Sequence, residues 1–554
     1  MTSLAARLAR PEILDLGLSV DVERFGGACE PDAIRLDANE SPWPPLYDDP
    51  LGANAHHYPE PRPARLAQAM AALYGVEAES LLVTRGADDA ADLLIRTFCR
   101  VGMDAIALFQ GACPAAVWSA KVQGARVIEV RPSGGFAFDA EAFIRAARAE
   151  PSLKLAFIAS PNGATGDPIA PDDVLAVADA LTETILVVDE SLIEFSPAAS
   201  LAPEAARLDN LVVLRSFSKG WGLAGARIGA AIGAPELIGL VGRALAPSSL
   251  PSHSVQAALA TLSPSRRPLH EERIATTIAD RRRMAEALVT SPLVDRVREG
   301  LGNFVLLEVK DAEGLGGRLR GLGIRVRFLP DIAPGAVRIT VGAEAENAAV
   351  LAAFGVPTSG RPRRRAEVVR DTRETRIAVA VDLDAAAPRR IDSGVAFFDH
   401  MLDQVAAHGG FSLNLACEGD LAIDAHHSLE DCALALGAAL SQALGERRGI
   451  ARFGFSLPMD ETQAHVLIDL SGRPFCVFEG DFAASHIGAY PTQMTAHVFR
   501  SLSQSLGAAI HVRVAGDNDH HKTEACFKAF GRALRQAVGR EADPRVLPST
   551  KGVL

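Results

Sequence analysis

Short apolar runs alternate with longer amphipathic segments through residues 81–232 of the chain. The runs that we interpret as strands lie at residues 81–83, 105–109, 125–130, 154–159, 184–189, 211–214 and 227–232. Continuous apolar strands separated by helices predict a mostly parallel sheet that is covered on both faces. Residues 237–350 return to helices with a few strands, which indicates a smaller α+β subdomain.

A break in this pattern divides the chain. Residues 356–364 contain Pro, Gly, Ser and a short basic cluster, which is more typical of a solvated linker than of an anion site. We therefore predict one domain at 1–355, the linker at 356–364 and a second domain at 365–554.

The second domain shows an internal repeat. A strand pattern at 374–383 is followed by helical patterns around residues 393–409 and 426–444, and a similar order returns between about 464 and 538. The repeats that we predict span about 366–450 and 451–545.

Length and composition narrow the class of protein. At 554 residues the chain is long enough for about two to four domains. The formal net charge of −12 argues against a general nucleic-acid binder, and it requires locally placed Arg and Lys for any anionic substrate. Seven cysteines without a CxxC pair are typical of reduced thiols in a cytoplasm. We see no signal peptide in residues 1–17 and no apolar run of about 18 residues, so we expect no membrane span.

The sharpest feature of the second domain is an HHxxE motif that occurs twice. The copies are His426 to Glu430 and His520 to Glu524; His400 precedes the first and His497 the second. Positions i and i+4 share a helix face, so the first histidine and the glutamate of each copy can bind one metal, while the second histidine points elsewhere. A duplication whose halves face each other across two metal ions explains the pattern. The alternative is a histidine-rich surface or unrelated core histidines.

We predict two mixed ligand sets from these residues. One ion takes His426, Glu430, His497 and His521, and the other takes His400, His427, His520 and Glu524. Three imidazoles and one carboxylate leave two positions open on an octahedral ion, which favours Mn²⁺ over a closed tetrahedral Zn²⁺ site.

The sharpest feature of the first domain surrounds a lysine. Lys219 lies in Ser216-Phe217-Ser218-Lys219-Gly220, between strands, where a lysine can form a Schiff base. Ser216, Ser218 and Arg227 are candidates for holding a phosphate, as is the helix start at Ala87 and Asp88. Asp189 ends a buried strand and can pair with the pyridinium nitrogen of a pyridoxal ring.

These residues, with motifs at 36–40, 58–61, 303–304 and 338–342, make residues 1–355 resemble histidinol-phosphate aminotransferase. The resemblance implies a fold-type I architecture, with a large mixed or parallel sheet and a small α+β subdomain, and pyridoxal 5′-phosphate as cofactor. It implies that Lys219 carries the cofactor, that Asp189 pairs with its ring nitrogen, and that Arg338 binds the carboxylate of the amino donor, glutamate. It also implies that the cofactor phosphate is surrounded by Ala87, Asp88, Ser216, Ser218 and Arg227, with Tyr58 reaching it from the partner of a dimer.

The chain departs from the family pattern at the expected cofactor or substrate contacts. An asparagine position is Gly163, a tyrosine position is Leu192, a ring-stacking aromatic position is Cys113, and an N-terminal tyrosine position is Ser19. Each lost hydrogen bond removes about 1–3 kcal/mol from the free energy that holds the cofactor in position. The alternative is therefore an aminotransferase-like scaffold without catalysis.

The second domain is similar to imidazoleglycerol-phosphate dehydratase through residues 398–404, 408–410, 426–431, 452–454, 458–461, 469–474, 519–524 and 548–554. The resemblance implies an α+β fold of two duplicated β-α units (ribosomal S5 domain 2-like), two Mn²⁺ ions per site and a large multimer with sites at subunit contacts. It implies that Arg452, Arg473, Ser549 and Lys551 bind the substrate phosphate. Glu374, or a metal-site glutamate such as Glu430 or Glu524, is the candidate base.

The two resemblances predict one bifunctional enzyme of histidine biosynthesis. Dehydration would produce imidazoleacetol phosphate, a ketone, which transamination with glutamate would convert to L-histidinol phosphate. We expect small phosphorylated imidazole substrates, homo-oligomers, no nucleic-acid or membrane partner, and a cytoplasmic location. A different interpretation makes the His–Glu clusters structural metal sites of an assembly protein.

Overall fold

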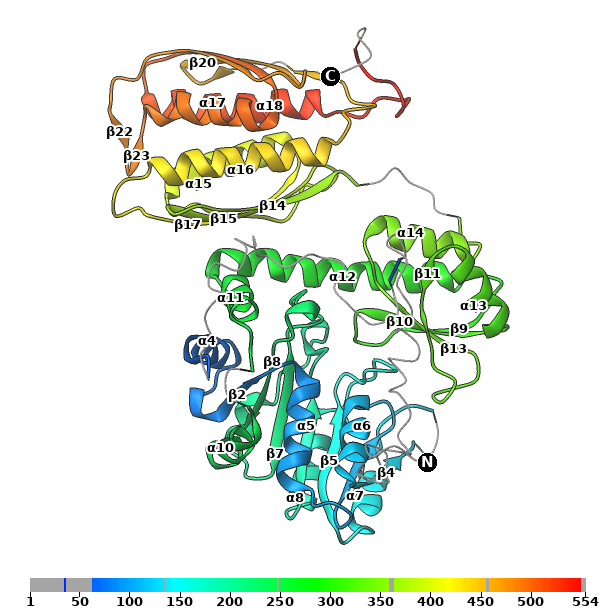
Figure 1. The fold of residues 1–554 in the computed structure, drawn as a ribbon. Helices are drawn as coiled ribbons and strands as arrows, with labels where there is room; N and C mark the ends of the chain where they lie inside the picture. Colours follow the sequence, from blue (N-terminus) through cyan, green and yellow to red (C-terminus); the bar gives the residue numbers. More distant parts are fainter. Residues whose placement is uncertain are drawn as a thin grey trace, which may run out of the picture. The chain divides into compact units, whose positions relative to one another are not determined.

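The computed structural model describes residues 34–35, 62–132, 135–246, 249–357, 363–454 and 458–549. They form two compact units, and each is described by itself (Figure 1). The first unit contains the described residues up to 261 and from 273 to 357, and the second contains residues 262–272 and those from 363 onward. Most of the predicted linker, residues 358–362, lies outside the described residues, so the linker stays a prediction.

Within the described ranges, seven strands form the central sheet of the first unit. Their spatial order is β2 (Leu81–Thr84), β8 (Gly229–Gly233), β7 (Leu211–Ser216), β6 (Ile185–Asp189), β5 (Leu153–Ala159), β3 (Ala105–Phe109) and β4 (Arg126–Val130). The strands from β7 to β4 pair in parallel, whereas β8 runs antiparallel to β7 and β2. Most strand residues are buried, which explains their continuous apolar runs. The predicted mixed, mostly parallel sheet is confirmed.

Helices lie before, between and after these strands along the chain. They are α4 (Ala64–Tyr74), α5 (Ala87–Phe98), α6 (Pro114–Gln123), α7 (Ala140–Arg148), α8 (Pro171–Ala180), α9 (Ala202–Ala205), α10 (Pro235–Ala244), α11 (Ser252–Thr261) and α12 (Arg267–Leu288). Buried residues of α5, α6 and α10 share one apolar core with the sheet. Asp139 shows how such a helix starts: its carboxylate accepts a hydrogen bond from the Ala142 N–H, at 2.9 Å.

A smaller antiparallel sheet completes the first unit. It runs β12 (Arg327–Phe328), β13 (Ala336–Thr340), β10 (Phe304–Val309), β9 (Val294–Arg298). Two helices, α13 (Ala312–Gly321) and α14 (Glu344–Ala353), contribute to its apolar core. A short parallel pair joins β1 (Ile34–Arg35) to β11 (Ile324–Arg325). This is the predicted α+β subdomain.

The second unit consists of two similar halves. The first sheet runs β14 (Arg365–Asp371), β15 (Thr375–Asp382), β17 (Ser412–Gly419), β16 (Arg389–Asp392). The second runs β18 (Phe453–Gly454), β20 (Thr462–Asp469), β24 (Ala509–Ala515), β21 (Phe475–Glu479), with β19 (Pro458–Met459) also on β20. In both sheets two antiparallel pairings precede a parallel one, as expected of a duplication. A hairpin of β22 (His486–Ile487) and β23 (Tyr490–Pro491) lies outside this pattern.

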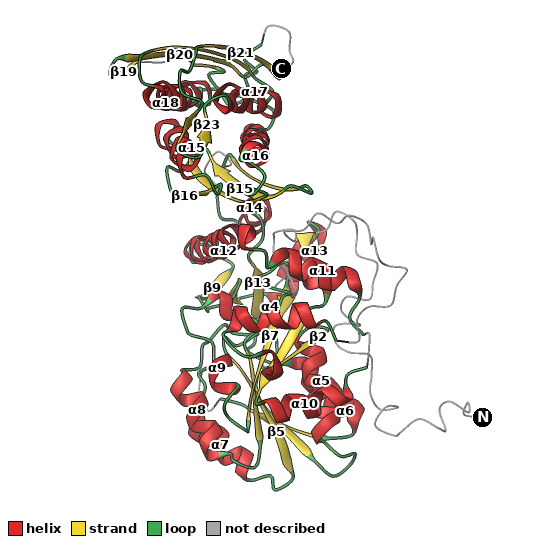
Figure 2. Cartoon of the chain, turned by 90° about the vertical axis from the view of Figure 1, so that its left-hand side faces the viewer, coloured by secondary structure: helices red, strands yellow, loops and turns green. Residues whose placement is uncertain are grey.

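Four helices lie between the two sheets (Figures 1 and 2). They are α15 (Ala396–Gly409), α16 (His426–Leu444), α17 (Met494–Leu506) and α18 (Asp519–Ala537). The main helix contacts cross between the halves, because α15 packs on α18 and α16 packs on α17. Both halves therefore share one apolar core. The duplicated α+β fold is confirmed.

Candidate functional site

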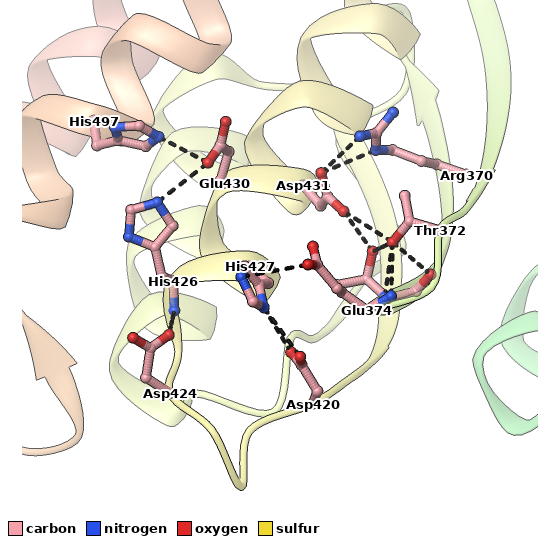
Figure 3. Close-up of polar contacts among 11 residues, drawn as sticks. Arg370, Thr372, Glu374, Asp420, Asp424, His426, His427, Glu430, Asp431 and His497 are labelled. Atoms are coloured by element: carbon pink, nitrogen blue, oxygen red, sulfur yellow. Dashed lines mark hydrogen bonds and ion pairs between the residues drawn. The ribbon is translucent and has the colours of Figure 1, made fainter.

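The first HHxxE motif opens helix α16. The carboxylate of Asp424 accepts a hydrogen bond from the His426 N–H at 2.7 Å, so the helix starts at the motif. One turn later, Glu430 Oε2 lies 3.2 Å from Nε2 of His426. Nε2 of His497, from α17, lies 3.0 Å from the same oxygen (Figure 3). Packing of α16 on α17 thus brings two imidazoles and a carboxylate together.

This trio has the chemistry of a metal site. The ligand atoms of His426, Glu430 and His497 all lie within 4.8 Å of one another. The Nε2 atom of His497 is buried and makes no hydrogen bond with the described residues, although a carboxylate oxygen faces it. An imidazole nitrogen and a carboxylate oxygen directed at each other are both able to bind a cation between them. Imidazole nitrogen with carboxylate oxygen suits Mn²⁺ as well as other divalent ions.

The second motif forms a matching group at the start of α18. Glu524 lies between His520, at 3.4 Å, and His400 of α15, at 3.6 Å. A lysine joins this group, because Lys528 Nζ is 2.7 Å from Oε1 of Glu524. Burial would raise the pKa of Glu524, but Lys528 and the two histidines outweigh it and hold that pKa below its usual value. The carboxylate is therefore charged and able to bind a cation.

The second histidine of each motif points away from its neighbour. Nδ1 of His427 lies 3.0 and 3.1 Å from the two carboxylate oxygens of Asp420, and Nε2 lies 3.6 Å from Glu374 (Figure 3). Nδ1 of His521 lies 3.0 and 3.1 Å from the two oxygens of Glu461. These hydrogen bonds raise the pKa of each imidazole above its usual value.

Within one chain the structure brings together three members of each predicted ligand set. His426, Glu430 and His497 meet, but His521, the predicted fourth ligand, lies with Asp460 and Glu461. His400, His520 and Glu524 meet, but His427 lies with Asp420 and Glu374. The complete sets of four stay predictions.

Of the predicted phosphate-binding residues, the structure places Ser549 beside Arg452. Its guanidinium binds Asp469 at 2.6 and 3.1 Å and donates to the Pro548 carbonyl at 2.7 Å, which places it beside Ser549. Arg473 is exposed in the loop that follows β20. Lys551 lies outside the described residues.

Arg452 lies at the opposite end of α18 from the histidines. The Arg452 N–H donates to the Ala537 carbonyl at 2.8 Å, whereas His520 is in the first turn. At 1.5 Å of rise per residue, the two helix ends are about 26 Å apart. That separation is far longer than a small phosphorylated imidazole.

In the first unit, the predicted phosphate-binding residues converge at the start of α5. Arg227 donates to Ser218 Oγ at 3.3 Å and pairs with Asp88 at 3.3 Å, and Ser216 Oγ accepts from the Ser218 N–H at 3.2 Å. Gly86, at φ 87°, allows this approach, because a Cβ there would lie 2.8 Å from Arg227 Nη2. Ala87 begins the helix. The arrangement fits a phosphate, since a helix start and a guanidinium both favour an anion.

Asp189 occupies the position expected for the partner of a ring nitrogen. It ends β6 and accepts from the Ser191 N–H at 2.9 Å and from the Ser191 hydroxyl at 2.5 Å. Burial raises its pKa, and the nearby charge of Lys219 opposes that rise. Cys113 is buried near Asp189, and burial raises the pKa of its thiol well above the usual value. Aspartate, lysine and the phosphate-binding group are thus all present.

The departures from the family pattern have structural counterparts. Arg338, on β13, donates to the Gly163 carbonyl and lies over the Phe304 ring at 5.2 Å. Leu192 is 5% exposed and packs with Phe304 in a small apolar cluster. Neither Gly163 nor Leu192 carries a polar side chain. Tyr58 and Ser19 lie outside the described residues.

Three charged residues next to the histidines were missed by sequence reasoning. They are Asp420, Glu461 and Lys528. Asp420 directly follows β17 and Glu461 directly precedes β20, so their nearness to the helices depends on how the sheets pack. Lys528 follows Glu524 by one helical turn, and that spacing was the available signal.

Comparisons with known proteins agree with the two units. Residues 31–354 match the family model "Aminotransferase class I and II", and residues 393–534 match "Imidazoleglycerol-phosphate dehydratase". A "Histidine biosynthesis bifunctional protein HisB" from Stenotrophomonas maltophilia is 56% identical over 191 residues, which are 34% of this chain and 53% of that protein. The chain thus spans about half the length of the curated relatives that it matches.

Two solved structures resemble the chain. Histidinol-phosphate aminotransferase from Sinorhizobium meliloti, in complex with pyridoxal-5′-phosphate, is 25% identical, with a TM-score of 0.55 over 63% of this chain and 96% of that one. The histidinol-phosphate aminotransferase from Clostridium acetobutylicum is 22% identical, with a TM-score of 0.52 over 58% and 98% of the two chains, and shows the fold alone. Among the described helices, none is long and apolar enough to cross a membrane.

Proposed function

The chain belongs to the class I and II aminotransferase family and also carries an imidazoleglycerol-phosphate dehydratase domain, and from this pairing we propose a bifunctional enzyme of histidine biosynthesis. The dehydratase unit converts imidazoleglycerol phosphate to imidazoleacetol phosphate. The aminotransferase unit converts that ketone to L-histidinol phosphate, with glutamate as amino donor. The product of one unit is thus the substrate of the other.

The observation that carries the dehydratase proposal is the pair of His–Glu groups. Glu430 and Glu524 each lie within 3.6 Å of two imidazoles, one from the same helix and one from a helix of the other half. Structural metal sites would need no anion-binding residues. Arg452 and Arg473, which the dehydratase resemblance assigns to a substrate phosphate, therefore favour catalysis over the assembly-protein interpretation.

Two divalent ions, Mn²⁺ in our proposal, would supply charge that stabilises the deprotonated imidazole ring of the substrate when bound. Glu374 is our candidate for removing the C2 proton. It is half exposed, and its Oε1 lies 3.6 Å from His427 Nε2, so it faces the reacting region rather than the core. Arg452, Arg473, Ser549 and Lys551 hold the phosphate and fix the orientation of the substrate.

The separation of these residues supports a shared site. A single chain holds its histidines and its phosphate-binding arginines about 26 Å apart along α18. We propose that a complete site combines the His–Glu group of one copy with His427 or His521 and the cationic group of other copies. The chain then works as a multimer.

For the aminotransferase unit, bound pyridoxal 5′-phosphate would supply the electron sink. Lys219 attaches the cofactor and moves the proton, Asp189 holds the ring nitrogen protonated, and Arg227 with Ser218 binds the phosphate. Arg338 binds the donor carboxylate. The Arg338–Gly163 contact competes with this last role, so Arg338 must turn when the donor enters.

Separate assays of the two steps on the intact protein test the proposal. We expect His426→Ala to remove dehydration and spare transamination, and Lys219→Ala to do the reverse. Each variant serves as the folding control for the other. A metal chelator should stop dehydration alone. Dehydration that survives both the chelator and His426→Ala would refute the dehydratase mechanism.

A second candidate function retains only the dehydratase as an enzyme. The observation that favours it is the loss of polar groups at Gly163, Leu192 and Cys113 around the cofactor position. The scaffold alternative requires that pyridoxal phosphate produces no new absorbance band and that Lys219→Ala changes nothing.

A further inference from the structure

Two of the predicted ligand histidines remain outside the His–Glu trios of the chain. His427 and His521 each present Nδ1 to a carboxylate, Asp420 for the first and Glu461 for the second, at 3.0 and 3.1 Å to both oxygens. Both imidazoles are about one-third exposed. Their ring planes are nearly perpendicular to those of the neighbouring His426 and His520. Each therefore faces a direction that the trio does not use.

A carboxylate at Nδ1 decides which nitrogen can bind a metal. Asp and Glu accept a hydrogen bond from Nδ1–H, so the neutral imidazole keeps its proton on Nδ1 and its lone pair on Nε2. The carboxylate also stops rotation of the ring about its Cβ–Cγ bond. Nε2 is thus prepared as a ligand before any ion arrives.

The two carboxylates come from different places in the fold. Asp420 directly follows β17, and its N–H donates to the Glu374 carbonyl at 3.1 Å. Glu461 directly precedes β20, and its Oε1 accepts from the Asn518 N–H at 3.3 Å. Both are therefore anchored through the sheets and loops rather than through the histidine helices. The halves reach the same contact with residues at non-matching positions.

A pair of ordinary surface ion pairs is the simpler explanation. Such pairs contribute about 0–1 kcal/mol and show no preference for one ring nitrogen. Here each carboxylate contacts Nδ1 with both oxygens. The carboxylate contacts Nδ1 in both halves, although it belongs to an Asp that follows a strand in one half and to a Glu that precedes a strand in the other. A role in orienting the imidazole ring explains why the same nitrogen is contacted in both halves.

We propose that Asp420 and Glu461 are positioning residues that fix the rings of His427 and His521 with Nε2 directed toward a metal ion whose other ligands belong to another copy of the chain. The inference rests on the proposed dehydratase function. It adds two residues that act on the metal through a histidine and touch neither metal nor substrate.

Mn²⁺ binding to the full-length protein, followed by electron paramagnetic resonance of the free ion without substrate, tests the inference. We expect Asp420→Ala and Glu461→Ala to weaken Mn²⁺ binding by about 10- to 100-fold. Asp420→Asn and Glu461→Gln keep an oxygen that accepts from Nδ1–H, so they should recover most of the affinity. Asp424→Asn is the matched control, because it removes the same charge from the same loop and keeps its bond to the His426 N–H.

Two outcomes would overturn the positioning role. One is wild-type Mn²⁺ affinity in both alanine variants. The other is an equal loss in the alanine and amide variants, which would show that charge alone matters. Neither outcome bears on the proposed dehydratase function. That function is refuted instead if the wild-type protein binds Mn²⁺ but does not dehydrate imidazoleglycerol phosphate. Circular dichroism and light scattering verify that each variant folds and assembles.

Discussion

Glu430 and Glu524 show how single residues define the proposed dehydratase site. Each carboxylate is shared by a histidine of its own helix and a histidine of the other half. Each glutamate lies between two imidazoles that the packing of α16 on α17 and of α15 on α18 brings together. In the aminotransferase unit, Asp189 has the comparable role of a buried acid with one assigned partner.

Gly163→Asn should strengthen cofactor binding. A Cβ at this position would lie 3.6 Å from the Gly111 carbonyl oxygen, an ordinary contact, so a side chain can start here without a backbone clash. One restored hydrogen bond is worth about 1 kcal/mol, which is roughly fivefold in affinity for pyridoxal phosphate. Absorbance titration measures the change, and the same substitution in a Lys219→Ala background is the control. Unchanged affinity would mean that the missing amide is not what limits this site.

Asp104→Asn should destabilise the first unit in a pH-dependent way. The side chain of Arg100 binds Asp104 at 2.9 Å through each oxygen and lowers the pKa of that carboxyl to about 2. An unfolded aspartate titrates near pH 4, so this stabilisation is complete above about pH 4 and is lost as the pH falls toward 2.

Because Arg100 is mostly exposed, we expect Asp104→Asn to lower the free energy of unfolding by about 1 kcal/mol at pH 7. The difference in unfolding free energy between the wild type and the variant should become smaller below pH 4. Urea unfolding at several pH values measures it. Asp92→Asn, which breaks the exposed Arg96 pair, is the control and should change little. A difference in unfolding free energy that stayed constant between pH 7 and pH 3 would contradict the stabilising role of the Arg100–Asp104 pair.

At the scale of elements, the two ligand-bearing helices start in the same way. A side-chain acceptor lies two residues before the first histidine in each: Asp424 binds the His426 N–H, and Asn518 binds the His520 N–H at 2.8 Å. The cap thus fixes the first turn, and the first turn carries the ligands. Helix stability and metal geometry are coupled at these two ends.

Asn518→Ala should therefore lower both the stability of α18 and the affinity for a metal ion. Loss of the cap costs about 1 kcal/mol of stability and releases the N–H groups of His520 and His521. We expect lower Mn²⁺ affinity together with a lower unfolding midpoint of the second unit. Asn518→Asp, which keeps the acceptor and adds charge favourable to a helix start, should retain both properties. Loss of stability with unchanged Mn²⁺ affinity would separate the cap from the metal site.

At the scale of the whole molecule, one chain holds only parts of the dehydratase site that we propose. The His–Glu trios and the Arg452 group lie at opposite ends of α18. Oligomerisation would thus serve catalysis by bringing these parts together, rather than only stabilising the chain.

Mixing two inactive variants tests this arrangement. His426→Ala removes a trio member and Arg452→Ala removes the phosphate-binding centre, so each alone should lack dehydratase activity. Dissociated and reassembled as an equal mixture, they should regain activity at roughly a quarter of the sites, those that receive both intact parts. A mixture as inactive as its components would place the whole site within one chain. Transamination, which uses neither residue, is the internal control.

A feature could be predicted from the sequence where it depends on positions that are near one another in the chain. The pairing of His426 with Glu430 follows from helix periodicity, and the alternation of apolar runs predicts the central sheet of the first unit. The contact of His427 with Asp420, and that of His521 with Glu461, had no such signal. Each carboxylate lies on a loop beside a strand, and only the packing of that sheet on the helix brings it to Nδ1.

The sequence by itself determined the two units, the duplication and the identity of the chemistry-bearing residues, because strand and helix periods and repeated motifs are properties of neighbouring positions. The tertiary structure decided which residues meet. The packing of α16 on α17 and of α15 on α18 brings each glutamate to a histidine of the other half. The length of α18 separates those groups from the phosphate-binding arginines. These distances depend on contacts between residues far apart in the chain, which no local pattern encodes.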